Sequence, residues 1–301
     1  MSLTVVSCVL SILGTGLILF SWVFWKDVRS KLRMLVVFLS VSDMVISSGN
    51  LLGSFMLMAH LTPGTFEKYC EAQSFFTTGS SMVSFMFTMF IAIYLYLMVS
   101  KKTDAAVRLV PLATFLSIVI PLLIVSLAMA FGALGLSQYS SRIGWCWIAP
   151  GENIYGPPLS FSGRIVFWSF VAGKGVEMTA YLFTPILYFY IRREMNAQQY
   201  DSRLLNANVR MTLQDTERKL VLIPFIFLGL RIWGSLRYVG TLTENEFLSC
   251  NVVLAALQGV GDSGQGWANA LLFCFFTRKV RVKIFECLCT CKKEAPQHPM
   301  E

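Results

Sequence analysis

The sequence predicts an all-α integral membrane protein, a seven-transmembrane helix bundle followed by a short amphipathic C-terminal helix. Of its 301 residues, 55% are hydrophobic and only 14% are charged, whereas charged residues make up about a quarter of a typical soluble domain. An apolar run of 18 or more residues is long enough to cross about 30 Å of hydrocarbon as a helix. Seven such runs occur, at about 5–25, 34–59, 71–99, 109–131, 164–191, 219–239 and 251–276.

Each run has its own justification as a span. The first begins within five residues of Met1 and has neither a basic n-region nor a small-residue cleavage site, so we expect a span there and not a signal peptide. The second, third, fourth and sixth runs are explained by length and hydropathy. The fifth and seventh are less apolar. In the seventh, four glycines surround Asp262 and Gln265, a composition that suits a helix facing other helices.

The basic residues predict the orientation of the bundle. The connections at 26–33, 101–108 and 192–219, with the tail from 278 on, hold 19 of the 25 Lys and Arg residues. Because such residues concentrate in cytoplasmic loops, we expect the N-terminus outside and the C-terminus in the cytosol. The same topology explains the net charge of +8. These charges would face the lipid bilayer, and they do not indicate a nucleic-acid partner.

The C-terminal region predicts a membrane-surface helix at the end of a single seven-helix domain over 1–291, followed by a short tail at 292–301. In "TRKVRVKIFECLCTC" the apolar residues share one helical face among basic ones, which is typical of a helix lying on the inner leaflet. Its alternating cysteines are candidates for S-acylation, with unmodified thiols as the alternative and a zinc site disfavoured by their spacing. They are Cys287, Cys289 and Cys291.

Three cysteines are expected on the outer side of the membrane. Cys70 begins the third run, and Cys146 lies in the long loop after the fourth, where an oxidising exterior allows a disulfide. We expect these two to pair and to pin the loop across the mouth of the bundle, although free thiols or a pairing with Cys250 are also possible. Trp145 and Trp147 flank Cys146 and are suited to the headgroup level or to covering a cavity.

Six ionisable residues fall within the predicted spans, where each costs roughly 3 kcal/mol to insert and is a functional candidate. In one hypothesis they only pair, Glu177 with Arg231 or Asp262 with Lys174, and hold the bundle together. In the other, the cations Lys174, Arg231 and Arg237 face a small anionic ligand that enters from outside. The candidate pocket residues are Lys174, Glu177, Arg231, Arg237, Trp145, Trp147 and Gln258.

A second polar cluster is expected where the second and seventh spans meet. Asp43, Asp262 and Asn269 could hold water, a proton or a cation there. Rearranging such a buried network would give the bundle two states of similar energy. A purely structural network is the alternative.

Six strings occur in one order along the chain: "LSVSDM" at 39–44, "IAIYLYL" at 91–97, "GWCWI" at 144–148, "GKGVEMTAYLFTPILYFYIRREMN" at 173–196, "KLVLIPFIFLGLRIW" at 219–233 and "LQGVGDSGQGWAN" at 257–269. With the seven spans and the two outer cysteines, they resemble an orphan group of G-protein-coupled receptors and, more distantly, the slime-mould cyclic-AMP receptors. The chain departs from rhodopsin-like receptors. It reads "YLMVSKK" and "NALLF" where their acidic-Arg-Tyr and Asn-Pro-x-x-Tyr motifs would lie.

The resemblance implies a receptor that passes an extracellular signal to a heterotrimeric G protein, in the plasma membrane or a ciliary membrane. The cytosolic face would then include Lys31, Arg33, Lys101, Arg192 and Lys219.

Other functions are less well supported by the residues. Neither an enzyme activity, a cofactor nor a metal is expected: the seventh run lacks a Schiff-base lysine for retinal, and His60 and His298 lie outside the spans. A small transporter would usually show an internal repeat. A membrane scaffold that does not signal stays open.

Overall fold

The computed structural model describes residues 2–58, 63–136, 145–149, 163–201, 222–243, 245–275 and 280–286. Each of the seven predicted spans is helical there. The first four are α1 (Ser2–Phe24), α2 (Lys31–Met58), α3 (Pro63–Val99) and α4 (Thr103–Ala130). The fifth joins α6 (Gly163–Ser169), a π-helical turn η2 (Phe170–Lys174) and α7 (Gly175–Asp201). The sixth is α9 (Leu222–Leu242), and the seventh is α11 (Val252–Ala270) with a π-helical turn η4 (Leu271–Phe275).

Two helices are longer than the apolar runs that predicted them. α3 begins at Pro63 where the run begins near 71, and α7 ends at Asp201 where the run ends near 191. Both extensions are polar, so hydropathy detects only the part of each helix that suits hydrocarbon. Among the described residues, four helices are long and apolar enough by themselves to cross a membrane: Ser2–Phe24, Lys31–Met58, Gly64–Val99 and Thr103–Ala130.

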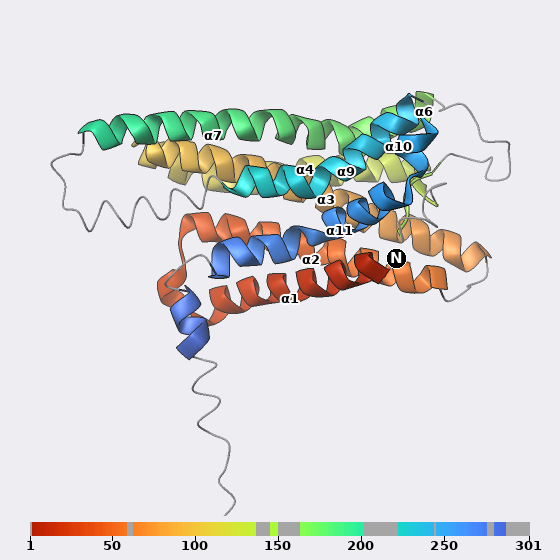
Figure 1. Cartoon of the computed structure of the whole chain (residues 1–301), viewed down its shortest axis with the longest axis horizontal. Coiled ribbons are helices and arrows are strands. Elements are labelled where there is room, and N and C mark those ends of the chain that lie inside the picture. Colours follow the sequence, from red (N-terminus) through yellow and green to blue (C-terminus); the bar gives the residue numbers. More distant parts are fainter. Residues whose placement is uncertain are drawn as a thin grey trace, which may run out of the picture.

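The helices run side by side along the long axis of the molecule (Figure 1). α11 packs against α1, α2 and α9, while α3 packs against α2, α4 and α7. The approach of α11 to α9 depends on Gly261, because a Cβ atom there would lie 1.8 Å from the carbonyl oxygen of Leu230. The predicted role of the glycines in the seventh span, to face other helices, therefore agrees with the packing.

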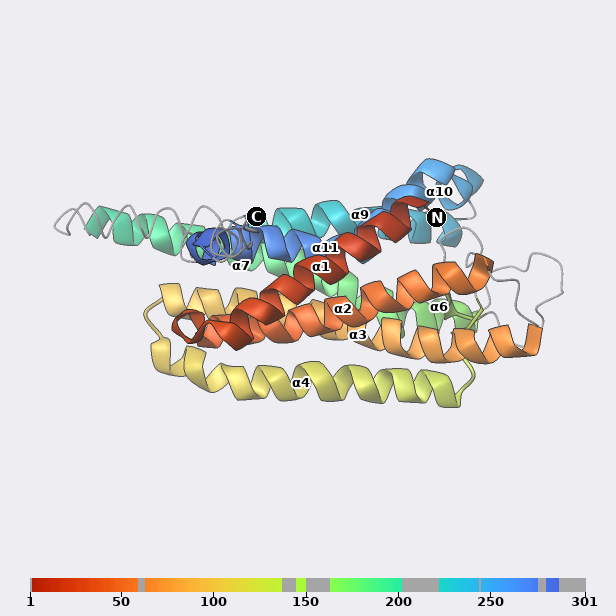
Figure 2. The same ribbon diagram turned by 90° about the horizontal axis from the view of Figure 1, so that it is seen from below.

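One face of the bundle is suited to lipid. α4 lies at its edge (Figure 2) and exposes a row of large apolar side chains, among them Leu112, Phe115, Leu122 and Leu127. An exposed apolar stripe of this length would be costly in water, but it matches acyl chains.

The disulfide predicted at the mouth of the bundle is confirmed. Cys70 at the outer part of α3 is bonded to Cys146, and their Cα atoms are 5.3 Å apart. The bonded loop forms a two-stranded antiparallel sheet, β1 (Leu134–Gly135) with β2 (Trp147–Ile148). Cys250, the alternative partner, is exposed at the end of the short helix α10 (Glu246–Cys250) and is not part of this disulfide.

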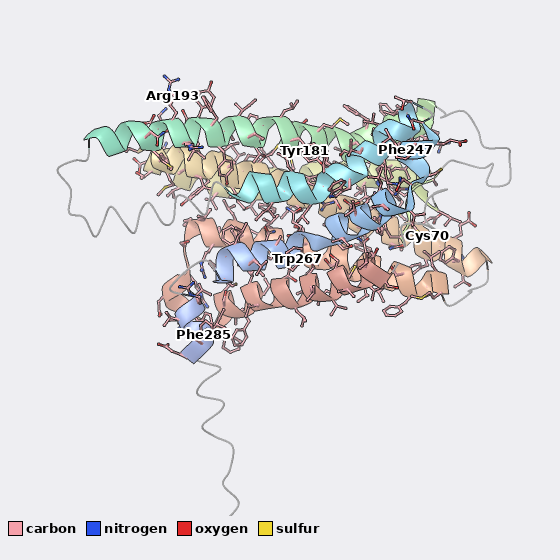
Figure 3. All side chains as sticks on the ribbon, viewed as in Figure 1. Cys70, Tyr181, Arg193, Phe247, Trp267 and Phe285 are labelled. Atoms are coloured by element: carbon pink, nitrogen blue, oxygen red, sulfur yellow. A yellow bond between two sulfur atoms is a disulfide. The ribbon has the colours of Figure 1, made fainter. Side chains whose placement is uncertain are left out.

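Part of the predicted C-terminal amphipathic helix is present at 280–286. Val280 is fully buried against the bundle and Ile284 packs beside it, whereas Phe285 points away and is 57% exposed (Figure 3). Lys283 forms an ion pair with Asp27 of the short 3-10 helix η1 (Lys26–Val28). The acylation candidates Cys287, Cys289 and Cys291 lie outside the described residues, as does the predicted domain limit at 291.

Candidate functional site

A polar cavity lies among α2, α3, α7, α9 and α11, beneath the loop that the disulfide holds. Its volume is about 80 Å³, smaller than the cavities that hold drug-sized ligands. Six of the seven pocket candidates line it, namely Lys174, Glu177, Arg231, Gln258, Trp145 and Trp147.

The outer loop is fixed over the cavity by α3. The Gln73 side-chain oxygen accepts a hydrogen bond from the Cys146 backbone N–H at 3.2 Å, and its amide nitrogen donates to the Gly49 carbonyl oxygen at 2.8 Å. A Cβ atom at Gly173 would lie 3.3 Å from Cζ2 of Trp147, so the ring lies directly on the π-helical turn η2. The two tryptophans thus belong to the outer wall of the cavity.

Glu177 is the most heavily bonded carboxylate in the cavity. Its Oε2 atom is 2.6 Å from Nζ of Lys174, and its Oε1 atom accepts from the hydroxyls of Tyr181 at 2.5 Å and Ser235 at 2.9 Å. The predicted pairing of Glu177 with Arg231 is therefore wrong. Lys174, three residues away on the same helical segment, reaches Glu177 without crossing the bundle.

Arg231 pairs instead with Asp262, across the α9–α11 interface. Its Nη1 atom is 3.3 Å from Oδ1 of Asp262, and its Nε atom donates to Gln265 at 3.4 Å. The guanidinium also lies 4.9 Å from the centre of the Phe85 ring, a cation–π contact. Its Nη2 atom is buried and has no hydrogen-bond partner among the residues that the structure describes. The second predicted pairing, of Asp262 with Lys174, is thus replaced by Arg231 with Asp262.

Arg237 is the pocket candidate that does not line the cavity. Its Nε and Nη2 atoms donate to the Ser249 carbonyl oxygen at 3.3 and 3.1 Å, and Nη1 donates to Oε1 of Gln258 at 2.5 Å. Arg237 thereby ties the outer end of α9 to α10 and α11. A fork of donors suits this bridging position, because one planar group reaches two acceptors.

The expected second cluster is present without one of its predicted members. Asp43 on α2 accepts from Asn269 of α11 and from Ser84 of α3, each at 2.8 Å. Asp262 is not part of it, because its carboxylate is bonded to Arg231 and to Gln258. Asp262 and Asn269 are seven positions apart on α11, so they share a helical face but lie about 10 Å apart along the axis. Asp262 and Asp43 therefore belong to separate networks.

Figure 2 shows the start of α2 and the ends of α3 and α7 at one end of the bundle, with α6 and α10 at the other. Of the residues predicted at the cytosolic face, Lys31, Lys101 and Arg192 are exposed. Arg33 is half-buried, and its guanidinium donates to the Phe273 carbonyl oxygen at 3.4 Å. Lys219 lies outside the described residues.

Several cavity residues were not predicted from the sequence. The most informative are Asn50 on α2 and Thr78 on α3, which are buried and line the cavity. A search limited to ionisable residues passes over neutral polar side chains, although an asparagine inside an apolar span is itself a usable signal.

Helices at all seven predicted spans, with a polar cavity beneath a disulfide-held loop, form the architecture of a G-protein-coupled receptor. The crystal structure of squid rhodopsin matches this fold with a TM-score of 0.68 over 99% of this chain and 85% of that one, at 16% identity. A likeness at that identity concerns the fold alone.

The sequence comparisons identify the family. The family described as slime mold cyclic AMP receptor matches residues 1–202. G-protein coupled receptor 157 of Rattus norvegicus is 33% identical, with 99% of this chain and 88% of the relative aligned. The Homo sapiens protein of that name is 32% identical, with 94% and 82% aligned. The chain belongs to the slime mold cyclic AMP receptor family of seven-transmembrane G-protein-coupled receptors.

Proposed function

We propose that this receptor responds to a small anionic ligand that enters the cavity from outside the cell and binds Arg231. The observation that carries the proposal concerns Arg231, which lines the cavity and whose buried Nη2 atom has no partner among the described residues. A buried charged donor without an acceptor loses the hydrogen bonds that water would make to it, which costs about 1–3 kcal/mol or more. An anionic oxygen placed there would remove that cost.

Lys174 is less available to a ligand than Arg231. Its ammonium is held by Glu177 at 2.6 Å, and releasing it would leave a buried carboxylate without its counter-ion. Among the residues that the structure describes, Nη2 of Arg231 has no hydrogen-bond partner even while Nη1 pairs with Asp262 at 3.3 Å. An anion can therefore bind Arg231 without breaking either ion pair.

Hydrogen bonds along α11 could couple ligand binding at Arg231 to the cytosolic side of the bundle. Gln265 accepts from Nε of Arg231, and Asn269, one turn further along the same helical face, donates to Asp43 of α2. A ligand that draws Arg231 outward would bias the position of α11 against α2. The receptor would then favour a state whose cytosolic face promotes nucleotide exchange on a heterotrimeric G protein.

The family name is consistent with the sign of the ligand charge, since cyclic AMP is an anion. We place the receptor in the plasma membrane or a ciliary membrane, with its N-terminus outside. The exposed cations Lys31, Lys101 and Arg192 support this orientation.

The test is G-protein dissociation in cells that express the chain, across a panel of alpha subunits. Ligand-free cells are compared with cells given small carboxylates, phosphate esters or cyclic AMP. We expect Arg231→Gln to weaken the response at least about tenfold at equal surface expression, because a charge-assisted hydrogen bond is lost. Lys68→Gln, which removes an exposed outer cation away from the cavity, is the matched control.

Two outcomes would count against the proposal. An unchanged response of the Arg231→Gln variant would remove Arg231 from the ligand site. Silence across the whole panel, with the protein present at the cell surface, would favour a scaffold that does not signal.

A further inference from the structure

The cavity has two chemically different walls. The wall from η2, α7, α9 and α11 carries all four of its ionisable side chains, Lys174, Glu177, Arg231 and Asp262. The wall from α2 and α3 is polar but uncharged. A ligand that spans the cavity therefore meets charge at one end and neutral hydrogen-bonding groups at the other.

The neutral wall also holds buried polar atoms that lack a partner among the described residues. They are Oδ1 of Asn50 and Oγ1 of Thr78, in residues that are 2% and 4% exposed. The Asn50 amide nitrogen donates to Oγ of Ser263 at 3.1 Å, which leaves the carbonyl oxygen as an acceptor. By contrast, the neighbouring hydroxyl of Thr77 is satisfied by the Gln73 carbonyl oxygen at 2.8 Å.

We infer that the ligand is a small hydroxycarboxylate, whose carboxylate binds Nη2 of Arg231 and whose hydroxyl donates to Oδ1 of Asn50, with Thr78 beside it. This inference rests on the proposed function, since it describes the ligand of the same cavity. Two of the three unpartnered atoms are thereby given a complementary group: an anionic oxygen for the guanidinium and an O–H donor for the amide oxygen.

The charges of the site argue against other ligand classes. An amino acid would bring an ammonium group to the neutral wall, and both acids are already bonded, Glu177 to Lys174, Tyr181 and Ser235, and Asp262 to Arg231 and Gln258. A buried ammonium without a counter-ion is strongly disfavoured. A dianion would need more than the one unused guanidinium nitrogen. A single negative charge with a neutral donor matches the site best.

The experiment measures ligand-dependent thermal stabilisation of the purified full chain in nanodiscs. The probes are lactate and 3-hydroxybutyrate, the matching carboxylates without the hydroxyl, propionate and butyrate, and the amino analogue alanine. We expect the hydroxy acids to bind at least about tenfold more tightly than their deoxy forms, because a site that hydrogen-bonds a hydroxyl rejects the analogue without it.

Variants then assign the two ends of the ligand. Arg231→Gln should abolish stabilisation by every carboxylate. Asn50→Asp, which places an anion on the neutral wall while the Ser263 hydroxyl can still donate to it, should shift the preference from lactate to alanine. Thr78→Val should reduce the preference for the hydroxyl, whereas Thr114→Val, the same change at a helical threonine outside the cavity, should keep it.

The failures of the two proposals are distinguishable. Equal stabilisation by hydroxy and deoxy acids, lost in Arg231→Gln, would overturn the hydroxycarboxylate assignment and leave the anion site standing. Stabilisation by none of the carboxylates would overturn the assignment, and the dissociation assay with phosphate esters and cyclic AMP then decides the wider proposal. If Asn50→Asp does not fold, an unaltered hydroxyl preference in Thr78→Val together with Asn50→Leu overturns the assignment.

Discussion

Asn269 donates a 2.8 Å hydrogen bond to the carboxylate of Asp43, although 226 positions separate the two residues in the sequence. Both side chains are buried, at 5% and 1% exposure. The bond joins α11 to α2, and Ser84 brings α3 into the same network at the second carboxylate oxygen. Three helices are thus joined around one acid.

Removing the Asn269 amide should destabilise the receptor. Asn269→Ala leaves a carboxylate oxygen of Asp43 without its donor, which costs about 1–3 kcal/mol, and the thermal unfolding midpoint of the purified protein should fall. The double exchange Asp43→Asn with Asn269→Asp swaps the donor and the acceptor between α2 and α11. The hydrogen bond can then form in the reverse direction, so the exchange should recover much of the lost stability. An exchange variant as unstable as the sum of its single changes would contradict a direct pairing.

Gly261 should tolerate no side chain. In Gly261→Ala the new Cβ atom would lie 1.8 Å from the Leu230 carbonyl oxygen and 2.8 Å from its carbon, so α9 and α11 would have to separate. We expect loss of folded receptor, measured by size-exclusion profile and surface expression. Gly229→Ala is the control, because its Cβ atom would meet nothing within 4 Å, and that helical substitution should be neutral or slightly stabilising. Normal folding of Gly261→Ala would refute the close approach.

We expect Arg237 to stabilise the packing of α9 against α10 and α11 and to have no effect on ligand affinity. Arg237→Lys keeps the charge but cannot donate to the Ser249 carbonyl and Gln258 in the same fork. We expect a loss of about 1–3 kcal/mol and faster hydrogen exchange in α10. Arg193→Lys, at an arginine that points away from the bundle (Figure 3), should change neither quantity. A large loss of ligand affinity with unaltered exchange would return Arg237 to the pocket.

The disulfide should protect Cys70 from thiol reagents. Cys146→Ser leaves Cys70 as a thiol at a buried position, so maleimide labelling of the denatured, unreduced protein should gain one site, and stability should fall by roughly 2–4 kcal/mol. Cys250→Ser should leave Cys70 protected, because Cys250 is not in the bond. If Cys70 stays unreactive in the denatured, unreduced Cys146→Ser variant, the assignment of the pair is wrong.

The C-terminal helix should be held by charge. A hydrogen bond from Lys283, with its positive charge, holds the pKa of the Asp27 carboxyl below the ordinary value. A lowered folded-state pKa means that the stabilisation is complete above the ordinary value of about 3.9 and is lost as the pH falls through the lowered one. A spin label at exposed Val282 should therefore stay immobile from pH 8 to 5 and become mobile in stronger acid.

The same label offers two further checks of this ion pair. Asp27→Asn should increase label mobility at neutral pH, and 1 M salt should act in the same direction because the pair is exposed. Asp104→Asn, at another exposed acid of a helix start, serves as the control. Equal mobility in Asp27→Asn and the parent would show that burial of Val280 alone holds the helix.

The sequence was sufficient for the spans and insufficient for the pairing of charges inside them. A run of apolar residues has a direct physical meaning in a bilayer, so α1 to α4 could be placed by length and hydropathy. The choice between Glu177 and Asp262 as the partner of Arg231 depends on helix rotation, to which hydropathy is insensitive. The π-helical turn η2 adds to the difficulty, because it ends at Lys174 and changes which residues face the cavity.

Part of the candidate site followed from the sequence for a similar reason. Charged residues inside spans are rare and costly, so Lys174, Arg231 and Asp262 could be selected one by one. Asn50 and Thr78 look like other polar residues of the spans in the sequence. They differ from them in lining the cavity and in having a side-chain oxygen with no hydrogen-bond partner among the described residues. That distinction is a property of the packed bundle, since many serines and threonines in these helices donate to their own backbone.

The two ion pairs of the cavity have an electrical consequence. Moving one elementary charge across the membrane potential involves about 2.3 kcal/mol per 100 mV. Lys174 with Glu177 and Arg231 with Asp262 are closed pairs, 2.6 and 3.3 Å apart, so a rearrangement that keeps them intact transfers no net charge and is insensitive to voltage. If the ligand is the anion proposed above, its charge is the one that moves into the membrane field without a counter-charge. A hyperpolarised membrane opposes its entry, and a depolarised one favours it.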